Sequence, residues 1–281
     1  MLEWLIVADS SCDLKTFNTG SKDIGFATIP FLIRMNQVDY EDSIDLQPEE
    51  IVNIMEQSDR TCTACPSPEM WADAFKQAKN VVAITISSSL SGSYDSAMLG
   101  RLLALEEDPN RNIHVIDSKS TGPKLAMLIQ AVLCQIKAKQ SFDTICEMCT
   151  DWVESIKTLF VLSRFQNLVK NGRMPKIIGV VANQLGVRLV GNASPEGKIH
   201  VIEPIRGERR AMKFLLAHME KSGFNGISAV ISYCLNEQNA LQLRDMIIEK
   251  WQNAVVQLLP TRGLDSYYAE RDGLILAFGT C

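Results

Sequence analysis

Histidine is scarce in this sequence, and the residues needed for several kinds of catalytic site are therefore missing. The 281 residues include only His114, His200 and His218, and no two of them have the i, i+4 spacing that places two metal ligands on one helix face. The sequence also has no G-x-S-x-G segment, the strained turn that exposes the nucleophile of α/β-type serine hydrolases. We therefore expect neither a histidine metal site nor a Ser-His-Asp triad.

An excess of positive charge and long apolar runs are missing as well. The chain has 28 Lys and Arg against 33 Asp and Glu, and Glu208 interrupts its densest basic cluster, residues 206–213. Nucleic-acid surfaces need clustered basic side chains. No apolar run approaches the roughly 20 residues of a membrane span, and the first run ends at Asp9 with no basic segment before it. We expect a soluble cytoplasmic protein that neither binds nucleic acid nor inserts stably into a membrane.

Eight cysteines are present, but their spacing does not indicate a metal or disulfide site. Cys62 and Cys65 form one C-x-x-C pair, and Cys146 and Cys149 form another. The two pairs are much farther apart than the ligand pairs of a zinc ribbon. The second pair also follows a helical pattern, in which a free thiol packs as a small apolar side chain. We therefore expect no metal site.

The first half of the chain alternates short β-rich runs with amphipathic segments, which is typical of a parallel α/β sheet. Its helices begin at Pro48 and at Ser67-Pro68, where serine is an N-cap and proline occupies the first turn. The second half mixes a hairpin with further helices and strands. Strands are predicted at 4–8, 26–32, 81–86, 113–116, 158–162, 227–233, 254–259 and 274–278, and the hairpin at 187–204. Further helices are predicted at 94–106, 141–155, 164–170, 208–221 and 237–252, and one more follows Gly122 and ends at Ile136. We expect two domains, residues 1–156 with a parallel Rossmann-like sheet and residues 157–281 with a mixed α/β fold.

Three hydroxyl-rich turns follow the predicted parallel strands: Asp9-Ser10-Ser11, Ser87–Ser93 and Asp117–Thr121. Open α/β sheets bind ligands at this edge, and a helix N-terminus with Gly92 beside it suits an anion. The Ser87–Ser93 loop has no lysine and no G-x-x-x-x-G-K-[ST] pattern, which favours a small, singly charged anion such as a carboxylate. The same hydroxyls are also common helix caps.

Asp9 leaves a second interpretation open. An aspartate at a strand end serves as the nucleophile in some phosphatases, so a small hydrolase or phosphatase built on Asp9 and the serine-rich loops is the alternative function. The next acid, Asp13, is four residues on, whereas that chemistry usually places it two residues on. The other interpretation is that Asp9 organises its turn.

Six segments, in order along the chain, resemble motifs of the DegV family. Residues 87–97, SSSLSGSYDSA, are similar to the family's S-S-x-L-S-G-[ST]-Y-x-S-A. Residues 63–68, TACPSP, resemble T-S-Q-P-S-P but lack the second hydroxyl. The remaining matches are 6–14, 115–118, 168–174 (similar to L-x-K-x-G-R-[IM]) and 205–211 (similar to V-R-x-x-K-[KR]-A).

The resemblance implies a bacterial protein of two α/β domains that binds one long-chain fatty acid in an apolar tunnel between them. The carboxylate is held by hydroxyls and backbone amides. In members of the fatty acid kinase B type, the protein presents the fatty acid to a partner kinase, which forms an acyl phosphate. The resemblance thus implies a lipid-binding protein with no catalytic residues of its own, no cofactor, and a fatty acid kinase as partner.

The resemblance also implies which residues contact the carboxylate. Thr63 and Ser91 are the leading contacts, and Gly92 and Ser93 supply amides and a hydroxyl beside them. Many members carry a contacting histidine near the C-terminus, and Tyr268 stands at that position here. A phenol can still donate a hydrogen bond, although packing as an aromatic is the other interpretation of Tyr268.

Further residues have supporting roles in this comparison. Asp9, Ser10 and Ser118 belong to the turns that support the carboxylate-binding loops. Arg173 and Arg206 lie in matching motifs, and either partner docking or domain packing fits them.

Overall fold

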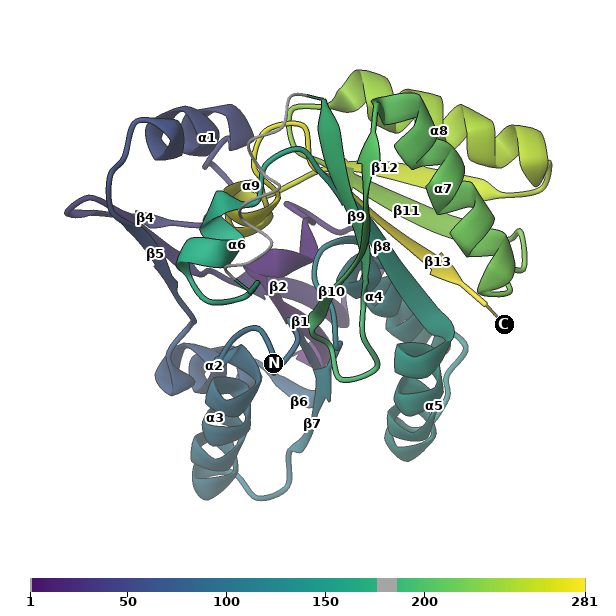
Figure 1. Ribbon diagram of the computed structural model, residues 1–281. Coiled ribbons are helices and arrows are strands. Elements are labelled where there is room, and N and C mark those ends of the chain that lie inside the picture. Colours follow the sequence, from purple (N-terminus) through teal and green to yellow (C-terminus); the bar gives the residue numbers. More distant parts are fainter. Residues whose placement is uncertain (1, 176–185, 281) are drawn as a thin grey trace.

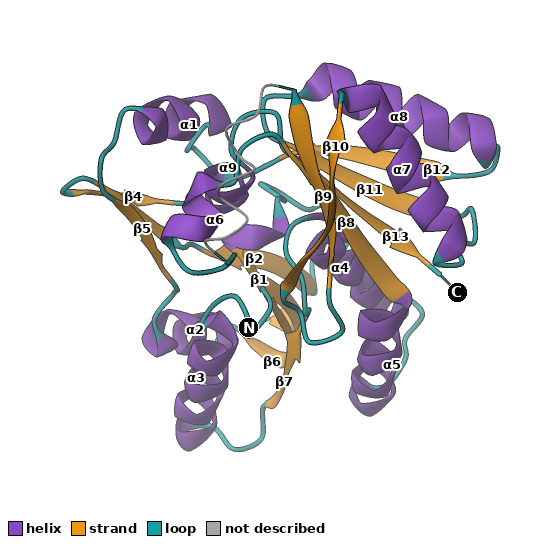
Figure 2. Ribbon diagram, in the orientation of Figure 1, coloured by secondary structure: helices purple, strands orange, loops and turns teal. Residues whose placement is uncertain are grey.

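The computed structural model describes residues 2–175 and 186–280, which Figures 1 and 2 show as ribbons. Within them the strands form a parallel sheet near the N-terminus, a mixed sheet in the second half, and a small antiparallel sheet. The expected α/β architecture, parallel in its first part and mixed in its second, is confirmed. In the sequence, an apolar segment follows Asn171-Gly172-Arg173 and extends to Leu185; it lies mostly outside the described residues. No described helix is long and apolar enough to cross a membrane.

The N-terminal sheet has four parallel strands in the order β2-β1-β6-β7. They are β1 (Leu2–Asp9), β2 (Ile24–Ile29), β6 (Ala78–Thr85) and β7 (Asn112–Asp117). Successive side chains of a strand point to opposite faces, so a strand covered on both faces is apolar throughout. In β1, Leu5 and Val7 pack into one core, whereas Ile6 and Ala8 pack into another.

Helices cover both faces of this sheet (Figure 2). On one face lie α2 (Pro68–Phe75) and α3 (Ser93–Glu107), and on the other lie α4 (Pro123–Lys137) and α5 (Phe142–Ser155). The predicted start of α2 is confirmed, because Ser67 Oγ accepts a hydrogen bond from the Met70 N–H at 3.5 Å. This bond satisfies one of the backbone donors that a helix leaves unpaired at its first turn.

The C-terminal sheet has the order β10-β9-β8-β13-β11-β12, with only β11 and β12 parallel among its described pairs. Its strands are β8 (Ile156–Leu162), β9 (Val187–Ala193), β10 (Ile199–Arg206), β11 (Ser228–Tyr233), β12 (Val255–Pro260) and β13 (Leu274–Gly279). One face is covered by α7 (Glu208–Lys221) and α8 (Glu237–Lys250), as Figure 1 shows. The predicted hairpin and both helices are confirmed.

Helix α4 packs between the two large sheets. It contacts β1 and β6 of the parallel sheet and β11 and β13 of the mixed sheet. A single apolar cluster therefore contains Ile6 and Val82 from the first sheet, Leu128 from α4, and Val230 and Ala277 from the second. Because this core is continuous, the two halves of the chain are held against each other along α4.

The small sheet departs from the sequence prediction. Its order is β4-β3-β5, all antiparallel, and α1 (Pro48–Glu56) packs with it; the strands are β3 (Leu32–Met35), β4 (Val38–Glu41) and β5 (Thr61–Ala64). The single strand predicted at 26–32 is wrong, because Pro30, which has no N–H to donate, separates β2 from β3. The sequence did not predict β4 or β5.

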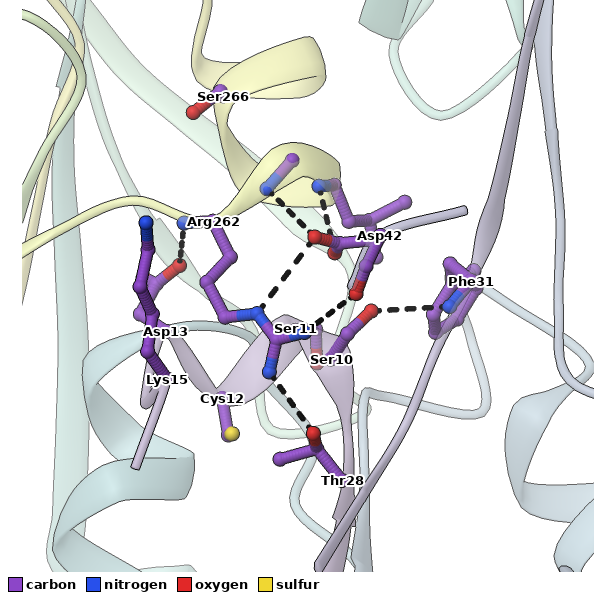
Figure 3. Close-up of polar contacts among 12 residues, drawn as sticks. Ser10, Ser11, Cys12, Asp13, Lys15, Thr28, Phe31, Asp42, Arg262 and Ser266 are labelled. Carbon is purple, nitrogen blue, oxygen red and sulfur yellow. Dashed lines mark hydrogen bonds and ion pairs between the residues drawn. The ribbon is translucent and has the colours of Figure 1, made fainter. Parts of the chain in front are cut away.

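The C-terminal half of the chain also contains two short helices, α6 (Gln166–Lys170) and α9 (Gly263–Ala269). Helix α9, which the sequence did not predict, packs against α1 and against the 3-10 turn η1 (Ser10–Cys12). Asp42 caps it, accepting hydrogen bonds from the N–H groups of Gly263 at 2.9 Å and Leu264 at 3.0 Å. Figure 3 shows these bonds, which anchor α9 to the N-terminal part of the chain.

Candidate ligand-binding site

The three hydroxyl-rich turns meet at one edge of the parallel sheet, as their positions after the strands predict. In the register of the sheet, Ala8 pairs with Ile84 and Thr85 pairs with Asp117, so β1, β6 and β7 end side by side. The loop after β6 leads into α3 through Gly92, and the loop after β7 leads into α4 through Gly122. This edge therefore combines helix N-termini with side-chain hydroxyls.

Asp9 is completely buried at this edge, and both its oxygens accept hydrogen bonds. Oδ1 accepts from the Ser11 hydroxyl at 2.5 Å, and Oδ2 accepts from the Ile86 N–H at 2.9 Å and the Ser93 hydroxyl at 2.7 Å. Burial raises the pKa of Asp9, and the hydrogen bonds partly offset that effect. This geometry leaves no exposed oxygen for nucleophilic attack and makes Asp9 the organiser of the turns after β1 and β6.

Three further residues singled out from the sequence lie beneath the surface of the site: Ser10 and Ser118, expected to support the loops, and Ser93, expected to contact the ligand. The hydroxyl of Ser10 accepts a hydrogen bond from the Phe31 N–H at 3.1 Å, and that of Ser118 donates to the Ser120 carbonyl at 3.1 Å. Ser93, expected to offer a hydroxyl to the ligand, is completely buried and donates to Asp9 instead. These side chains hold the loops in place.

Four other expected residues line one cavity, which we call the polar cavity. It encloses about 850 Å³ of empty space, counted out to its open mouth. Its lining includes Thr63, Ser91, Gly92 and Tyr268 together with Phe31, Ala64, Cys65, Ile86, Leu90, Thr121, Leu168, Arg173, Ile199, Leu264 and Asp265. The structure thus brings together residues from β5, the loop before α3, and α9.

Thr63 and Tyr268 form a hydroxyl pair in the polar cavity. Thr63 Oγ1 and the Tyr268 phenol oxygen lie 2.8 Å apart, and either atom can be the donor. Burial raises the pKa of Tyr268, so the phenol keeps its proton at neutral pH. Two hydroxyl protons are available and only one is needed between the two oxygens, so the other remains for a ligand.

Arg173 also lines the polar cavity, whereas Arg206 does not lie among its lining residues. The Arg173 guanidinium donates from Nε to the Leu90 carbonyl at 3.1 Å, and its charge acts to lower the pKa of Tyr268. Arg206 is exposed at the end of β10. The sequence treated the two arginines alike, and only the structure shows that Arg173 lines the polar cavity.

A second cavity, the apolar slot, continues from the polar cavity along β8, β9 and β13 of the mixed sheet. Its empty space, counted out into open solvent, is about 550 Å³. It shares Leu90, Thr121, Leu168, Ile199, Asp265 and Tyr268 with the polar cavity. Its other lining residues are Ser120, Thr158, Phe160, Leu162, Asn192, Ala193, Gly197, Lys198, Ala269 and Ile275.

The site is suited to a molecule with a long apolar part and one polar end. The apolar slot offers hydrocarbon side chains, whereas the polar cavity offers hydroxyl donors, the start of α3 and one guanidinium. Among residues 2–175 and 186–280, no three His, Cys, Asp or Glu side chains are grouped as a metal ion requires. Asp265 was not predicted as a lining residue, because no local pattern marks it. Leu90 and Thr121 lie within two of the hydroxyl-rich turns that the sequence marked, but were not named individually.

Comparisons with known proteins agree with this geometry. A family model described as an uncharacterised protein of the DegV family matches residues 3–264. A DegV domain-containing protein of Streptococcus gordonii is 37% identical over 278 residues, which cover 99% of both chains. The crystal structure of the Streptococcus pneumoniae Fatty Acid Kinase (Fak) B3 protein loaded with linoleic acid is 35% identical, with a TM-score of 0.97 over 100% of both chains. A Eubacterium eligens DegV family protein loaded with heptadecanoic acid is 32% identical, with a TM-score of 0.94 over 99% of this chain and 100% of that one.

Proposed function

Since this chain belongs to the DegV family, we propose that it binds one long-chain fatty acid, with the acyl chain in the apolar slot and the carboxylate in the polar cavity. Two relatives of more than 30% identity that match the chain over nearly its whole length are loaded with linoleic acid and heptadecanoic acid. These ligands share a carboxylate and a long hydrocarbon chain, which is the shape that the two joined cavities accommodate.

The observation that carries the proposal is the position of the Thr63–Tyr268 pair at the junction of the cavities. Tyr268 lines both of them, so a chain that fills the apolar slot brings its head group to the hydroxyl pair. Each buried methylene contributes about 0.8 kcal/mol, so the tail supplies most of the affinity. The head group needs only a few hydrogen bonds, which set the orientation of the ligand.

We assign the carboxylate contacts to Thr63, Ser91, Tyr268 and the backbone at Gly92. Ser91 is half-buried beside Gly92, where Ser91 Oγ accepts a hydrogen bond from the Ser93 N–H at 3.2 Å. That bond leaves the Ser91 O–H as a donor toward the polar cavity. Arg173 supplies a positive charge at the same cavity, which stabilises an anion there.

The two parts of the chain have different tasks in this proposal. Residues 1–156 carry the loops that bind the carboxylate, and residues 157–281 close over the acyl chain through β8, β9 and β13. The exposed residues Ala64, Cys65 and Gly92 at the polar cavity leave the head group reachable from solvent.

The partner in this proposal is a fatty acid kinase, as the name of the S. pneumoniae relative indicates for that protein. The chain itself performs no chemistry and has no cofactor; it holds the fatty acid and presents the carboxylate. Arg206, exposed at the end of β10, is the proposed docking residue, whereas Arg173 acts within the cavity.

Mass spectrometry tests the binding role directly. We expect protein purified from a bacterial host to carry about one fatty acid per chain, detected under native conditions and again after solvent extraction. A Thr63→Val/Ser91→Ala double variant loses the ligand, whereas the control Thr150→Val/Ser222→Ala, at exposed positions of α5 and the end of α7, keeps it. A chain that stays empty after incubation with a fatty-acid mixture contradicts the proposal.

A further inference from the structure

Two buried carboxyl groups beside the site each have one oxygen without a hydrogen-bond partner among the described residues. Asp13 is 3% exposed and Asp265 is 2% exposed, and in both residues the unpaired atom is Oδ2. Their other oxygens are engaged: Asp13 Oδ1 accepts from the Arg262 N–H at 2.8 Å, and Asp265 Oδ1 accepts from the Thr121 hydroxyl at 2.7 Å. A buried carboxylate oxygen left unpaired is costly, so these two atoms need an explanation.

Both unpaired oxygens face the same small space, next to Gly122. A Cβ atom on Gly122 would lie 2.8 Å from Asp265 Oδ2, 2.9 Å from Asp13 Oδ2 and 3.6 Å from Ser232 Oγ. Gly122 has φ +58° and ψ −120°, a conformation that glycine adopts far more readily than other residues. The backbone therefore leaves this space to two carboxyl groups from η1 and α9 and one hydroxyl from β11.

The charges around this space do not balance if every group is ionised. Three buried carboxyl groups, Asp13, Asp42 and Asp265, surround one buried cation, Arg262. Lys124 of α4 is also buried, but its ammonium donates to the Val153 carbonyl of α5 at 2.7 Å. The guanidinium is committed to Asp42, with Nε 3.7 Å from Oδ1, as Figure 3 shows. Uncompensated charge in a protein interior is removed by protonation or by a counter-ion.

Among residues 2–175 and 186–280, no other titratable group that faces the pair supplies the missing positive charge. The nearby thiols of Cys12 and Cys234 are buried, and burial raises the pKa of each to about 12, so both are neutral. The acids of α1 and Lys170 of α6, the elements packed against α9, are exposed at the surface. Burial likewise raises the pKa of Asp13 to about 7, and burial together with the Asp13 charge raises the pKa of Asp265 well above its ordinary value.

We propose that Asp13 and Asp265 share one proton as a carboxyl–carboxylate pair, and that this proton decides whether the neighbouring cavity accepts an anionic head group. Asp265 lines both the polar cavity and the apolar slot, one turn of α9 away from Tyr268. With the shared proton in place, Asp13 and Asp265 together carry one negative charge. Without it, both carboxyl groups are ionised, the negative charge beside the ligand carboxylate doubles, and like charges at close range repel.

The second half of this inference rests on the proposed fatty-acid binding, whereas the shared proton does not. Infrared spectroscopy tests the proton without any ligand measurement, because a protonated carboxyl has its own carbonyl stretching band that shifts in D₂O. We expect this band at about pH 7 in the parent protein and its loss in Asp265→Asn and in Asp13→Asn. Asp151→Asn, an exposed position of α5, is the matched control and keeps the band.

Two results overturn the shared proton. In the first, the parent protein lacks the band and retains a metal cation through desalting, and Asp265→Asn releases that cation. The space beside Gly122 then holds an ion and not a proton. In the second, the band survives both single substitutions. Using two asparagine variants keeps the test informative if one of them does not fold.

The effect on binding is measured by partition of labelled linoleic acid between protein and lipid vesicles from about pH 6 to 9. The ligand ionises identically in both experiments, so its own titration cancels when the affinity of Asp265→Asn is divided by that of the parent. The pH dependence of this affinity ratio therefore reports the ionisation of the Asp13–Asp265 pair. We expect the parent to lose affinity by up to about tenfold per pH unit above the pKa of the pair, and the variant to lose less. An affinity ratio that stays constant with pH overturns the role of the shared proton in ligand binding. If the infrared carboxyl band is present but the protein binds no fatty acid at any pH, the proposed function is refuted and the shared proton is not.

Discussion

The phenol oxygen of Tyr268 lies 2.8 Å from Oγ1 of Thr63, although the two residues are 205 positions apart. This contact joins α9 to β5 and places a hydroxyl donor at the junction of the polar cavity and the apolar slot. Tyr268 packs edge-to-face on Tyr267, with ring centroids 4.8 Å apart, so its ring is positioned independently of the hydroxyl. Tyr268 therefore combines both interpretations that the sequence offered, a packed aromatic and a hydrogen-bond donor.

Removing only the phenol oxygen separates these two roles. We expect Tyr268→Phe to bind linoleic acid about 10- to 150-fold more weakly, since a hydrogen bond to a charged group contributes about 1.5–3 kcal/mol. Binding is not abolished, because Thr63 and Ser91 remain. Thermal stability changes little because the ring is kept. The partition measurement described above provides the affinities, with Tyr40→Phe in β4 as the control. Equal affinity in Tyr268→Phe and the parent shows that the phenol does not contact the ligand.

Arg262 is predicted to be among the most sensitive residues of the fold. It is 1% exposed and donates to the Leu14 carbonyl at 3.0 Å and the Thr28 hydroxyl at 3.1 Å. Because Arg262→Met leaves the Asp42 charge buried and unpaired, we expect a loss of about 3–5 kcal/mol in urea unfolding. Arg34→Met breaks the exposed pair with Asp39, which solvent screens, and is expected to change the free energy of unfolding far less. Similar losses in the two variants contradict the assigned role of Arg262.

Gly122 is predicted to tolerate no side chain. Gly122→Ala places a methyl group 2.8 Å from Asp265 Oδ2 and 2.9 Å from Asp13 Oδ2, in addition to the strain of a positive φ. Gly172 also has a positive φ, +73°, but nothing lies within 4 Å of its Cβ position. We expect Gly172→Ala to cost about 1 kcal/mol from the backbone alone, and Gly122→Ala at least about 1 kcal/mol more. Calorimetric unfolding of both variants gives the difference, and equal losses rule out the steric conflict.

The buried acids predict a specific dependence of stability on pH. Burial raises the pKa of Asp9, Asp42 and Asp265 in the folded protein, whereas an unfolded aspartate titrates near about 3.9. Between these values the folded state binds more protons than the unfolded state, so stability falls as pH rises through the folded pKa values. We expect the urea midpoint to decrease from about pH 5 to pH 8, and to decrease less in Asp265→Asn. A midpoint that rises over this range contradicts the raised pKa values.

The sequence by itself determined the features that depend on local interactions. The apolar runs of β1 and β6, the N-cap at Ser67 and the hairpin around Gly197 follow from periodicity, capping and turn chemistry within a few residues. The order of the parallel strands then brings the three hydroxyl-rich turns to one edge. A motif resemblance added Thr63 and Tyr268, which share the polar cavity with Ser91.

Only the tertiary structure decided the features that depend on contacts between distant residues. Helix α9 has seven residues, too few to be stable alone, and exists because Asp42 caps it from the other half of the chain. The role of Arg173 in the cavity and the meeting of Asp13 with Asp265 likewise arise from packing around α4 and α9. The energies that position these side chains come from burial and long-range hydrogen bonds, and no local pattern in the sequence encodes them.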